Sequence, residues 1–193
     1  MTCDDQFLDD DGNFHLPPGD RTFVGCIMEG RDLMHAKVAH ADLTGAGLYW
    51  ANCQNANMEG TILNDADLRG AHFDEANMRG ASLERAALGF DNLGGTTHLH
   101  KVDLSGANLR SAEVHGAEFI GACLVGADLR GCRGDATPPE RPTRFDGADL
   151  TDARLEGARL TGAQYDAQTR FPKGFDPKRA GMVLRAGRRK PRT

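Results

Sequence analysis

The sequence predicts an all-β protein, a four-sided parallel β-helix closed by short terminal caps. An apolar residue recurs at every fifth position over most of the chain, and alanine usually stands two residues before it. The 24 glycines, with a hydrophobic content of 39% and an aromatic content of 6%, indicate a core of small side chains and frequent turns. A period of five fits neither an α-helix nor a flat strand, because both would scatter the apolar residues over several directions. A chain that turns a corner in every unit would instead point them all at one axis.

The units form three runs, and we call the apolar third residue of each unit its center. The first run begins with RTFVG and CIMEG, ends with DNLGG and has centers from Phe23 to Leu93. After a slip of register near residues 94–97, centers resume at Leu99, and a second interruption at 132–142 precedes the last run. Because the same motif resumes after each interruption, we predict one repeat array over residues 21–167, with two local loops.

Four units would close one coil of twenty residues, and this geometry explains the alanines. Successive coils would stack as parallel strands about 4.8 Å apart. Four centers already fill the axis of a coil, so a large residue two positions before them would overpack it. Alanine occupies that position in 19 of the 27 units. The sequence further predicts one ladder of stacked side chains, made of Leu43, Leu63, Leu83 and Leu104.

Both ends of such a rod need covers, because bare ends would expose unpaired strand edges. Residues 1–20 hold six aspartates and no base, and we predict that this acidic leader caps the first coil. We predict that residues 168–186 cap the last coil, with a short helix that begins at Pro177. Three apolar side chains would lie across that coil: Phe171, Phe175 and Met182. The basic residues 187–193 are expected to be disordered and solvated.

The charge of the chain is unevenly distributed. The net charge is −5, but residues 1–169 carry 13 more acids than bases, and residues 170–193 carry eight more bases than acids. The repeat array alone is at about −7. An electrostatic partner of the body should therefore be cationic, and the body is not expected to bind nucleic acid or a membrane.

The sequence shows no apparatus for catalysis or for cofactor binding. It has no GxGxxG, P-loop, GxSxG or Cys/His nucleophile context, so no enzyme and no cofactor are predicted. The five cysteines are an odd number without a CxxC pair, which indicates reduced thiols. With no signal peptide and no apolar run of about 20 residues, the protein is expected in the cytoplasm. Six histidines fall on outward positions of different coils and faces: His35, His40, His72, His98, His100 and His115. No acid or cysteine stands at ligand spacing beside them, so no metal site is predicted.

The pattern A(D/N)LxG, seen at residues 41–45, 66–70 and 127–131, resembles the pentapeptide-repeat family. The resemblance covers about residues 21–167 and implies a right-handed quadrilateral β-helix. It leaves two classes of function. The first is a rigid, non-catalytic platform that binds a protein partner through a face, the loop at 132–142 or an aromatic patch. The alternative follows some members, the gyrase-binding quinolone-resistance and self-resistance proteins, in which an acidic rod resembles duplex DNA and occupies the DNA saddle of a type II topoisomerase.

Two sets of residues are candidates for partner binding. The aromatic set is Tyr49, Trp50 and Phe90, with Gly70 between the two coils, which predicts a gap flanked by rings. It would contact a partner or a second copy of the chain, although isolated apolar surface residues are also common. The acidic set would imitate regularly spaced phosphates. Its members are Asp42, Asp65, Asp67, Asp74, Glu75, Glu84 and Asp103.

Overall fold

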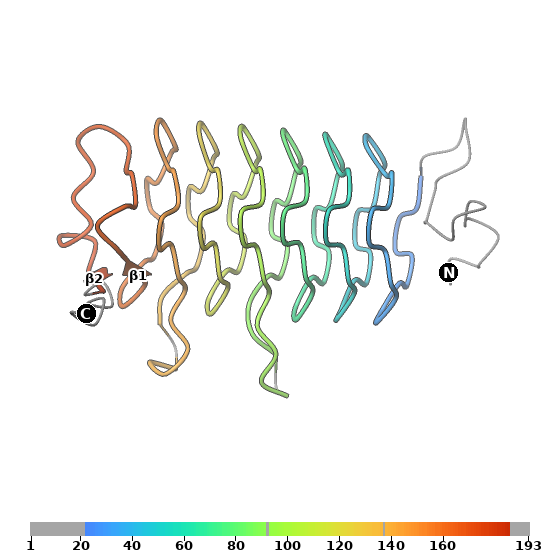
Figure 1. Ribbon diagram of the computed structural model, residues 1–193, viewed down its shortest axis with the longest axis horizontal. Helices are drawn as coiled ribbons and strands as arrows, with labels where there is room; N and C mark the ends of the chain where they lie inside the picture. The colour runs from blue at the N-terminus through green and yellow to red at the C-terminus, as the bar shows by residue number, and fades with distance from the viewer. Residues whose placement is uncertain (1–21, 92, 137, 186–193) are drawn as a thin grey trace, which may run out of the picture.

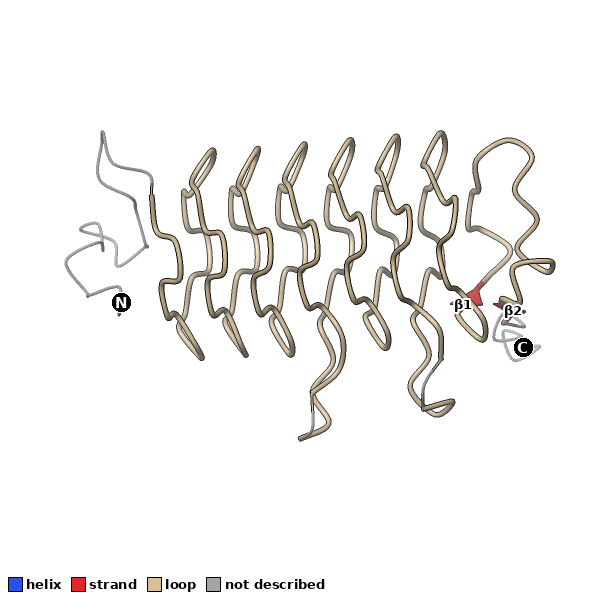
Figure 2. Cartoon of the chain, turned by 180° about the vertical axis from the view of Figure 1, so that it is seen from behind, coloured by secondary structure: helices blue, strands red, loops and turns tan. Residues whose placement is uncertain are grey.

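The computed structural model describes residues 22–91, 93–136 and 138–185, and these wind into a rod of stacked coils (Figure 1). Isolated parallel bridges join each unit to the unit one coil further on, beginning with Thr22 and Asp42. The only continuous strands in the described ranges, β1 (Gln164–Tyr165) and β2 (Val183–Leu184), pair in parallel at the C-terminal end (Figure 2). We number the faces of the rod 1 to 4 by the bridge columns that run through Asp42, Asp67, His72 and Asn77.

A regular unit makes three backbone hydrogen bonds to the next coil and one across its own corner. In the unit of residues 41–45, the Leu43 and Gly45 amides donate to the Ile62 and Asn64 carbonyls at 2.7 and 2.8 Å, and the Ala41 carbonyl accepts from the Ile62 amide at 2.8 Å. The Ala46 amide donates to the Leu43 carbonyl across the corner at 3.0 Å. The fifth residue turns the corner in the left-handed region, with φ of 66° at Gly45 and 57° at Trp50. Glycine adopts this region without steric cost, which explains the frequent glycine at the end of a unit.

The core follows the predicted pattern with two exceptions. All predicted centers are buried except Phe23, which is partly buried, and Leu93, which is 81% exposed. The prediction that Leu93 points inward is therefore wrong. Deeper in the rod, Phe119 and Phe145 stack in adjacent coils with ring centroids 5.2 Å apart.

The predicted leucine ladder is correct for three members and wrong for the fourth. Leu43, Leu63 and Leu83 stack through successive bridges on face 1, and Leu109 continues the column because Ser82 pairs with Asn108. Leu104 instead follows Met78 on face 4. The unit around Leu93 lies outside the coil, so this coil spans 26 residues rather than 20.

The second interruption is shorter than residues 132–142. Cys132 is fully buried at an alanine position, and Arg133 bridges to both neighboring coils. Gly134 then takes the place of a center, where a Cβ would lie 3.0 Å from Val114 Cγ2 and 3.1 Å from Leu160 Cδ2. Glycine is needed there because the axis is already full. We count the loop from Asp135, although the Ala136 amide still donates to the Thr161 carbonyl of the next coil at 2.8 Å.

The C-terminal segment covers the last coil without the predicted helix. The Phe171 ring stacks on Phe175 and meets Tyr165 edge-on, and Met182 is buried. Residues 177–181 form a turn, after which the chain pairs with β1 through β2. The acidic leader and the basic tail lie outside the described residues.

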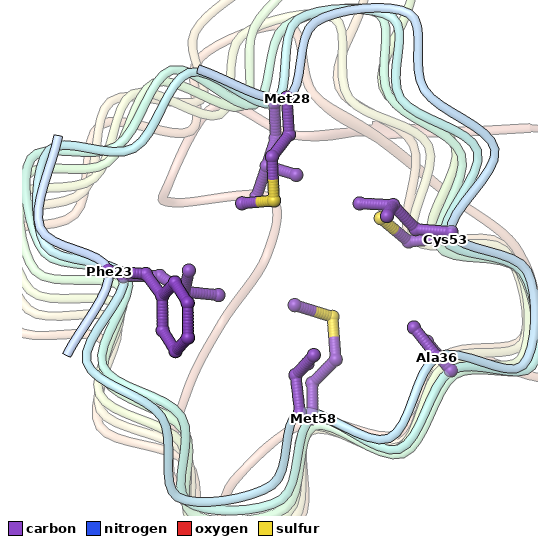
Figure 3. A pocket seen from close by; sticks show the side chains of 10 residues that line it. Phe23, Met28, Ala36, Cys53 and Met58 are labelled. Carbon is purple, nitrogen blue, oxygen red and sulfur yellow. The ribbon is translucent and has the colours of Figure 1, made fainter. Parts of the chain in front are cut away.

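The N-terminal end of the core holds a small apolar cavity. Figure 3 shows Phe23, Met28, Ala36 and Met58 converging on it, and its volume is about 10 Å³. Cys53 lines the same cavity as a free thiol, and burial raises the pKa of this thiol to about 12. Cys26 takes part in a disulfide, so the prediction that every cysteine is reduced is wrong.

Candidate protein-binding ridge

The two loops leave the rod at the same corner. Loop 1 (residues 90–96) follows face 2 of one coil, and loop 2 (residues 135–142) follows face 2 two coils further on. Figures 1 and 2 show both loops projecting from one edge of the rod. Trp50 turns the same corner two coils before loop 1. We call Trp50 and the two loops together the corner ridge.

A threonine closes each loop where the chain re-enters the coil. The Thr97 hydroxyl donates toward the carbonyls of Leu68 and Gly89 and accepts from the Gly70 amide at 3.2 Å. It thereby bridges an amide and a carbonyl that face each other directly at the regular corners. After loop 2, Thr143 likewise accepts from the Gly116 amide at 3.1 Å, and it donates to the Val114 carbonyl at 2.9 Å as Thr97 does to the Leu68 carbonyl. Both threonines are fully buried at alanine positions.

A buried carboxylate holds loop 1 in place. Asp91 is 3% exposed, and its Oδ2 accepts the Tyr49 hydroxyl at 2.7 Å and the Trp50 indole N–H at 2.6 Å. Its Oδ1 accepts the amides of Leu93 and Gly95 at 2.9 and 2.7 Å. Burial alone would raise the pKa of Asp91, but these four donors outweigh it and lower the pKa to about 2. The aspartate is therefore a fixed anion that ties the loop to the coil of Trp50.

The predicted gap between Trp50 and Phe90 is absent, because loop 1 fills it. The Trp50 ring lies over Gly70, where a Cβ would be 3.0 Å from the indole nitrogen. A Cβ at Gly95 would overlap the same ring from the loop side. The indole is thus enclosed by two glycines and Asp91, yet the residue remains 42% exposed.

Phe90 connects loop 1 to loop 2 rather than facing Trp50. Its ring meets the His115 ring edge-on at 5.3 Å and rests on Gly116 in the coil between the loops. The Arg141 guanidinium of loop 2 lies 5.6 Å from the center of the Phe90 ring, close enough for a cation–π contact. A Cβ at Gly94 would also lie 2.9 Å from the Arg141 side chain. The aromatic patch and the second loop, two separate candidates in the sequence, form one continuous surface.

The acidic candidates do not form a single stripe. The set is spread over all four faces, and five members pair with a base. The partners are Arg85 for Asp65 and Glu84, Arg69 for Asp67, Lys101 for Glu75 and Arg79 for Asp103, at 2.6 to 3.2 Å. The hydrogen bond from Arg69 lowers the pKa of Asp67 below its ordinary value, with burial acting in the opposite direction. Asp42 accepts from its neighbor Thr44, and Asp74 faces His100.

The structure corrects the placement of the histidines. His72 and His98 lie on face 3 of adjacent coils, with ring centroids 4.4 Å apart. Acidic side chains lie beside these histidines. Asp74 groups with His72 and His98, and Glu118 groups with His98 and His100, so the face has two overlapping groups of possible metal ligands. Burial, followed by the neighboring His72, lowers the pKa of His98 below its ordinary value. The interpretation that these residues lie apart and lack acidic neighbors is wrong.

The chain is similar to several solved structures of repeat proteins. HetL from Nostoc sp. strain PCC 7120, described as a pentapeptide repeat protein involved in heterocyst differentiation regulation, is 26% identical over 84% of this chain and 71% of HetL, with a TM-score of 0.40. Rfr23 from Cyanothece 51142 is 24% identical over 78% and 91% of the two chains, with a TM-score of 0.36. Full-length QnrB1, a plasmid-mediated fluoroquinolone resistance protein, is 21% identical over 76% and 82%, with a TM-score of 0.29.

A search of curated proteins finds no match to this sequence. Nothing in the part of the chain that the structure describes forms a helix of the length and apolar character needed to cross a membrane. The model of the pentapeptide repeats matches in eight copies, over residues 50–88, 97–133 and 143–164. These segments make up just over half of the sequence, and the gaps between them contain the two loops. The chain therefore belongs to the pentapeptide-repeat family, and it forms a right-handed quadrilateral β-helix.

Proposed function

We propose that the protein is a non-catalytic scaffold that binds a protein partner through the corner ridge, in the cytoplasm. The observation that carries this proposal is the buried carboxylate of Asp91, which holds the exposed Trp50 side chain and the backbone of the exposed Leu93 on one ridge. Side chains that are fixed before binding lose little conformational freedom when a partner arrives. Tryptophan is also among the residues that most often anchor protein interfaces.

Two buried thiols and the Asp91 carboxylate are poorly suited to catalysis, which supports a non-catalytic role. Burial raises the pKa of the Cys53 and Cys132 thiols to about 12, so neither supplies a thiolate near neutral pH. Asp91 has a pKa of about 2 and uses both oxygens to hold loop 1. A general base is most effective when its pKa lies near the working pH, and Asp91 does not meet this condition.

Capture of partners by three forms of the protein tests the proposal. Leu93→Ser removes the exposed apolar side chain of loop 1, and Ile62→Ser is the matched control, since Ile62 is 37% exposed on regular face 1. We expect a partner from the lysate of the source organism to bind wild type and Ile62→Ser. We expect Leu93→Ser to bind it about tenfold more weakly, a change of about 1.4 kcal/mol. Equal binding to all three forms would show that the ridge is not the contact.

A second copy of the chain is another occupant that this experiment can identify. Light scattering would then show a dimer for wild type and Ile62→Ser and a monomer for Leu93→Ser. A dimer that persists in Leu93→Ser would place the contact between copies elsewhere.

Binding to DNA gyrase or another type II topoisomerase by imitation of DNA is the alternative. The excess of acids in the repeat array favors it. The ion pairs of Asp65, Asp67 and Asp103 weigh against it, because they reduce the negative field that a DNA-binding saddle would meet. A gyrase supercoiling and fluoroquinolone-cleavage assay with purified protein decides between the two functions. Inhibition or protection that weakens as salt rises would support mimicry, whereas no effect at low salt would exclude it.

A further inference from the structure

Face 3 brings four polar side chains into a square between two adjacent coils. His72 and His98 are bridge partners, so their Cα atoms are held side by side by the stacking of the coils. Asp74 and His100 stand two residues further along the same two units, and alternate residues of an extended chain point to the same side. The backbone therefore fixes the square, and none of its members lies in loop 1 or loop 2.

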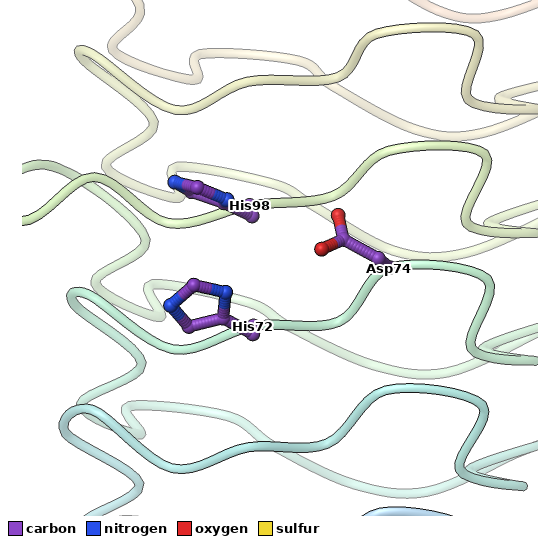
Figure 4. Close-up of side chains that lie close together, drawn as sticks. All are labelled: His72, Asp74 and His98. Atoms are coloured by element: carbon purple, nitrogen blue, oxygen red, sulfur yellow. The ribbon is translucent and has the colours of Figure 1, made fainter.

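The two imidazoles and the Asp74 carboxylate converge. Figure 4 shows the rings of His72 and His98 one above the other, with the oxygens of Asp74 turned toward the space beside them. The ring planes are inclined by 48°, and one ligand atom from each of the three side chains lies within 4.8 Å of the other two. All three residues are half-buried, so the space between them is open to solvent on one side.

Asp74 is oriented without being neutralized by a permanent cation. Its Oδ1 accepts the His100 backbone amide at 2.9 Å, and its Oδ2 accepts the Gln54 side-chain amide at 3.2 Å. Among the described residues, no lysine or arginine forms an ion pair with it, in contrast to the five paired acids of the acidic set. Hydrogen bonds that orient a carboxylate in this way are common around metal ligands.

The overlapping group of His98, His100 and Glu118 is less suited to an ion. The His98 and His100 rings are nearly parallel, inclined by only 21°, with centroids 5.2 Å apart. Glu118 already contacts His100 at 2.9 Å and Arg144 at 3.0 Å, and Arg144 would oppose a second positive charge. Because His98 belongs to both groups, the face can hold one ion rather than two.

We propose that His72, His98 and Asp74 bind one divalent transition-metal cation of the zinc class on face 3. Imidazole nitrogen and carboxylate oxygen bind zinc at about 2.0 to 2.2 Å, which separates tetrahedral ligand atoms by roughly 3.3 Å. Small side-chain rotations would bring the three ligand atoms from their present spacing to this one. Solvent or a ligand from a partner would complete the coordination. The ion would fasten two coils together beside Thr97, where the chain returns from loop 1.

Zinc titration of the metal-free full-length protein by calorimetry tests this inference, with magnesium as the comparison ion. His72→Asn and His98→Asn each remove one ligand, and both should fold, because Asn52 occupies the same column one coil earlier. His40→Asn is the matched control, since it removes a histidine from another part of the rod. We expect one zinc per chain for wild type and His40→Asn, at least tenfold weaker binding for both ligand variants, and no response to magnesium.

A second readout keeps the test independent of folding defects. Zinc should raise the melting temperature of wild type and His40→Asn but not that of His98→Asn, while the metal-free forms melt alike. Loss of binding in Glu118→Gln with retention in His72→Asn would overturn the proposal in favor of the other group. Absence of zinc binding to wild type, or equal binding by all variants, would also overturn it. None of these results depends on whether the corner ridge binds a partner.

Discussion

The two loops are insertions at the same corner of the same fold, yet they are attached differently. Each leaves face 2 and each returns through a buried threonine that bridges an amide and a carbonyl. Loop 1 is in addition tied by the four hydrogen bonds of Asp91. Loop 2 has instead an exposed ion pair between Asp135 and Arg159 and the contact of Arg141 with Phe90. Both loops thus rejoin the coil through the same kind of threonine contact, whereas the contacts that hold each loop in place differ.

Removal of the Asp91 carboxylate should have the largest effect. Asp91→Ala leaves the Tyr49 hydroxyl, the Trp50 indole and two amides without their acceptor, and we expect a loss of about 2 to 4 kcal/mol in the free energy of unfolding. Urea unfolding followed by the fluorescence of Trp50, the one tryptophan of the chain, measures it. Glu140→Ala, an exposed acid of loop 2, is the control and should change stability by less than about 0.5 kcal/mol. Equal effects would mean that the two loops are anchored alike.

The closing threonines should have a smaller and nearly equal effect. Thr97→Val and Thr143→Val preserve shape but leave the Gly70 and Gly116 amides unpaired, so each should cost about 1 to 3 kcal/mol. Thr61→Val is the control, because the Thr61 hydroxyl only donates to the Val38 carbonyl and bridges no amide. Thermal unfolding of the three variants measures the difference. A loss in Thr61→Val as large as in the other two would contradict the bridging role.

The acid stability of the protein should depend on Asp91. The folded-state pKa of about 2 lies below the value of about 3.9 expected for the unfolded chain, so the folded protein favors the ionized form. The stabilization is present above about pH 4 and is lost as the pH falls toward 2. Unfolding free energies of wild type and Asp91→Asn should therefore converge over this window. A difference that stays constant between pH 5 and 2 would show that the charge is not the source.

Replacement of the outer part of loop 2 should have the smallest effect. Four glycine or serine residues in place of 138–141 keep the loop length and remove the contact of Arg141 with Phe90, which is worth about 0.5 to 1 kcal/mol. We expect nearly unchanged thermal stability and, if loop 2 contributes to the interface, weaker partner binding. Loss of folding would show that loop 2 belongs to the structural core.

The regular part of the fold could be predicted from the sequence because its signal is local and repeated. Alanine and a bulky center at fixed spacing have one interpretation, and the buried core confirms it. The same pattern gave a wrong prediction at Leu93, because an apolar residue in register is interpreted as a center whether or not it lies inside the coil. Asp91 at an alanine position was the available signal, because a carboxylate is buried only with partners. The faces on which the seven acidic candidates lie could be assigned only from the register of the coils in the structure. Their role in binding a partner stays a prediction.

The contacts between coils could not be predicted because they depend on the length of each insertion. His72 and His98 are 26 residues apart, and a uniform coil of twenty residues would have placed His98 beside another unit. The predicted end of the second run of units was wrong for a different reason. Gly134 has no apolar side chain, so the last unit before loop 2 carries no hydrophobic signal even though it completes the coil.

The threonine bridge has a consequence for how such a rod can diversify. Because one hydroxyl accepts the amide that pairs with the next coil at a regular corner, the number of residues between exit and return is free to vary while the stacked coils keep their order. The coil between the two loops has Ala117 where the other two have Thr97 and Thr143, and its corner is uninterrupted. Insertions at this edge therefore do not change the number of coils stacked along the axis. A rod of this kind can carry an added surface segment at this edge without a change in the length of its core.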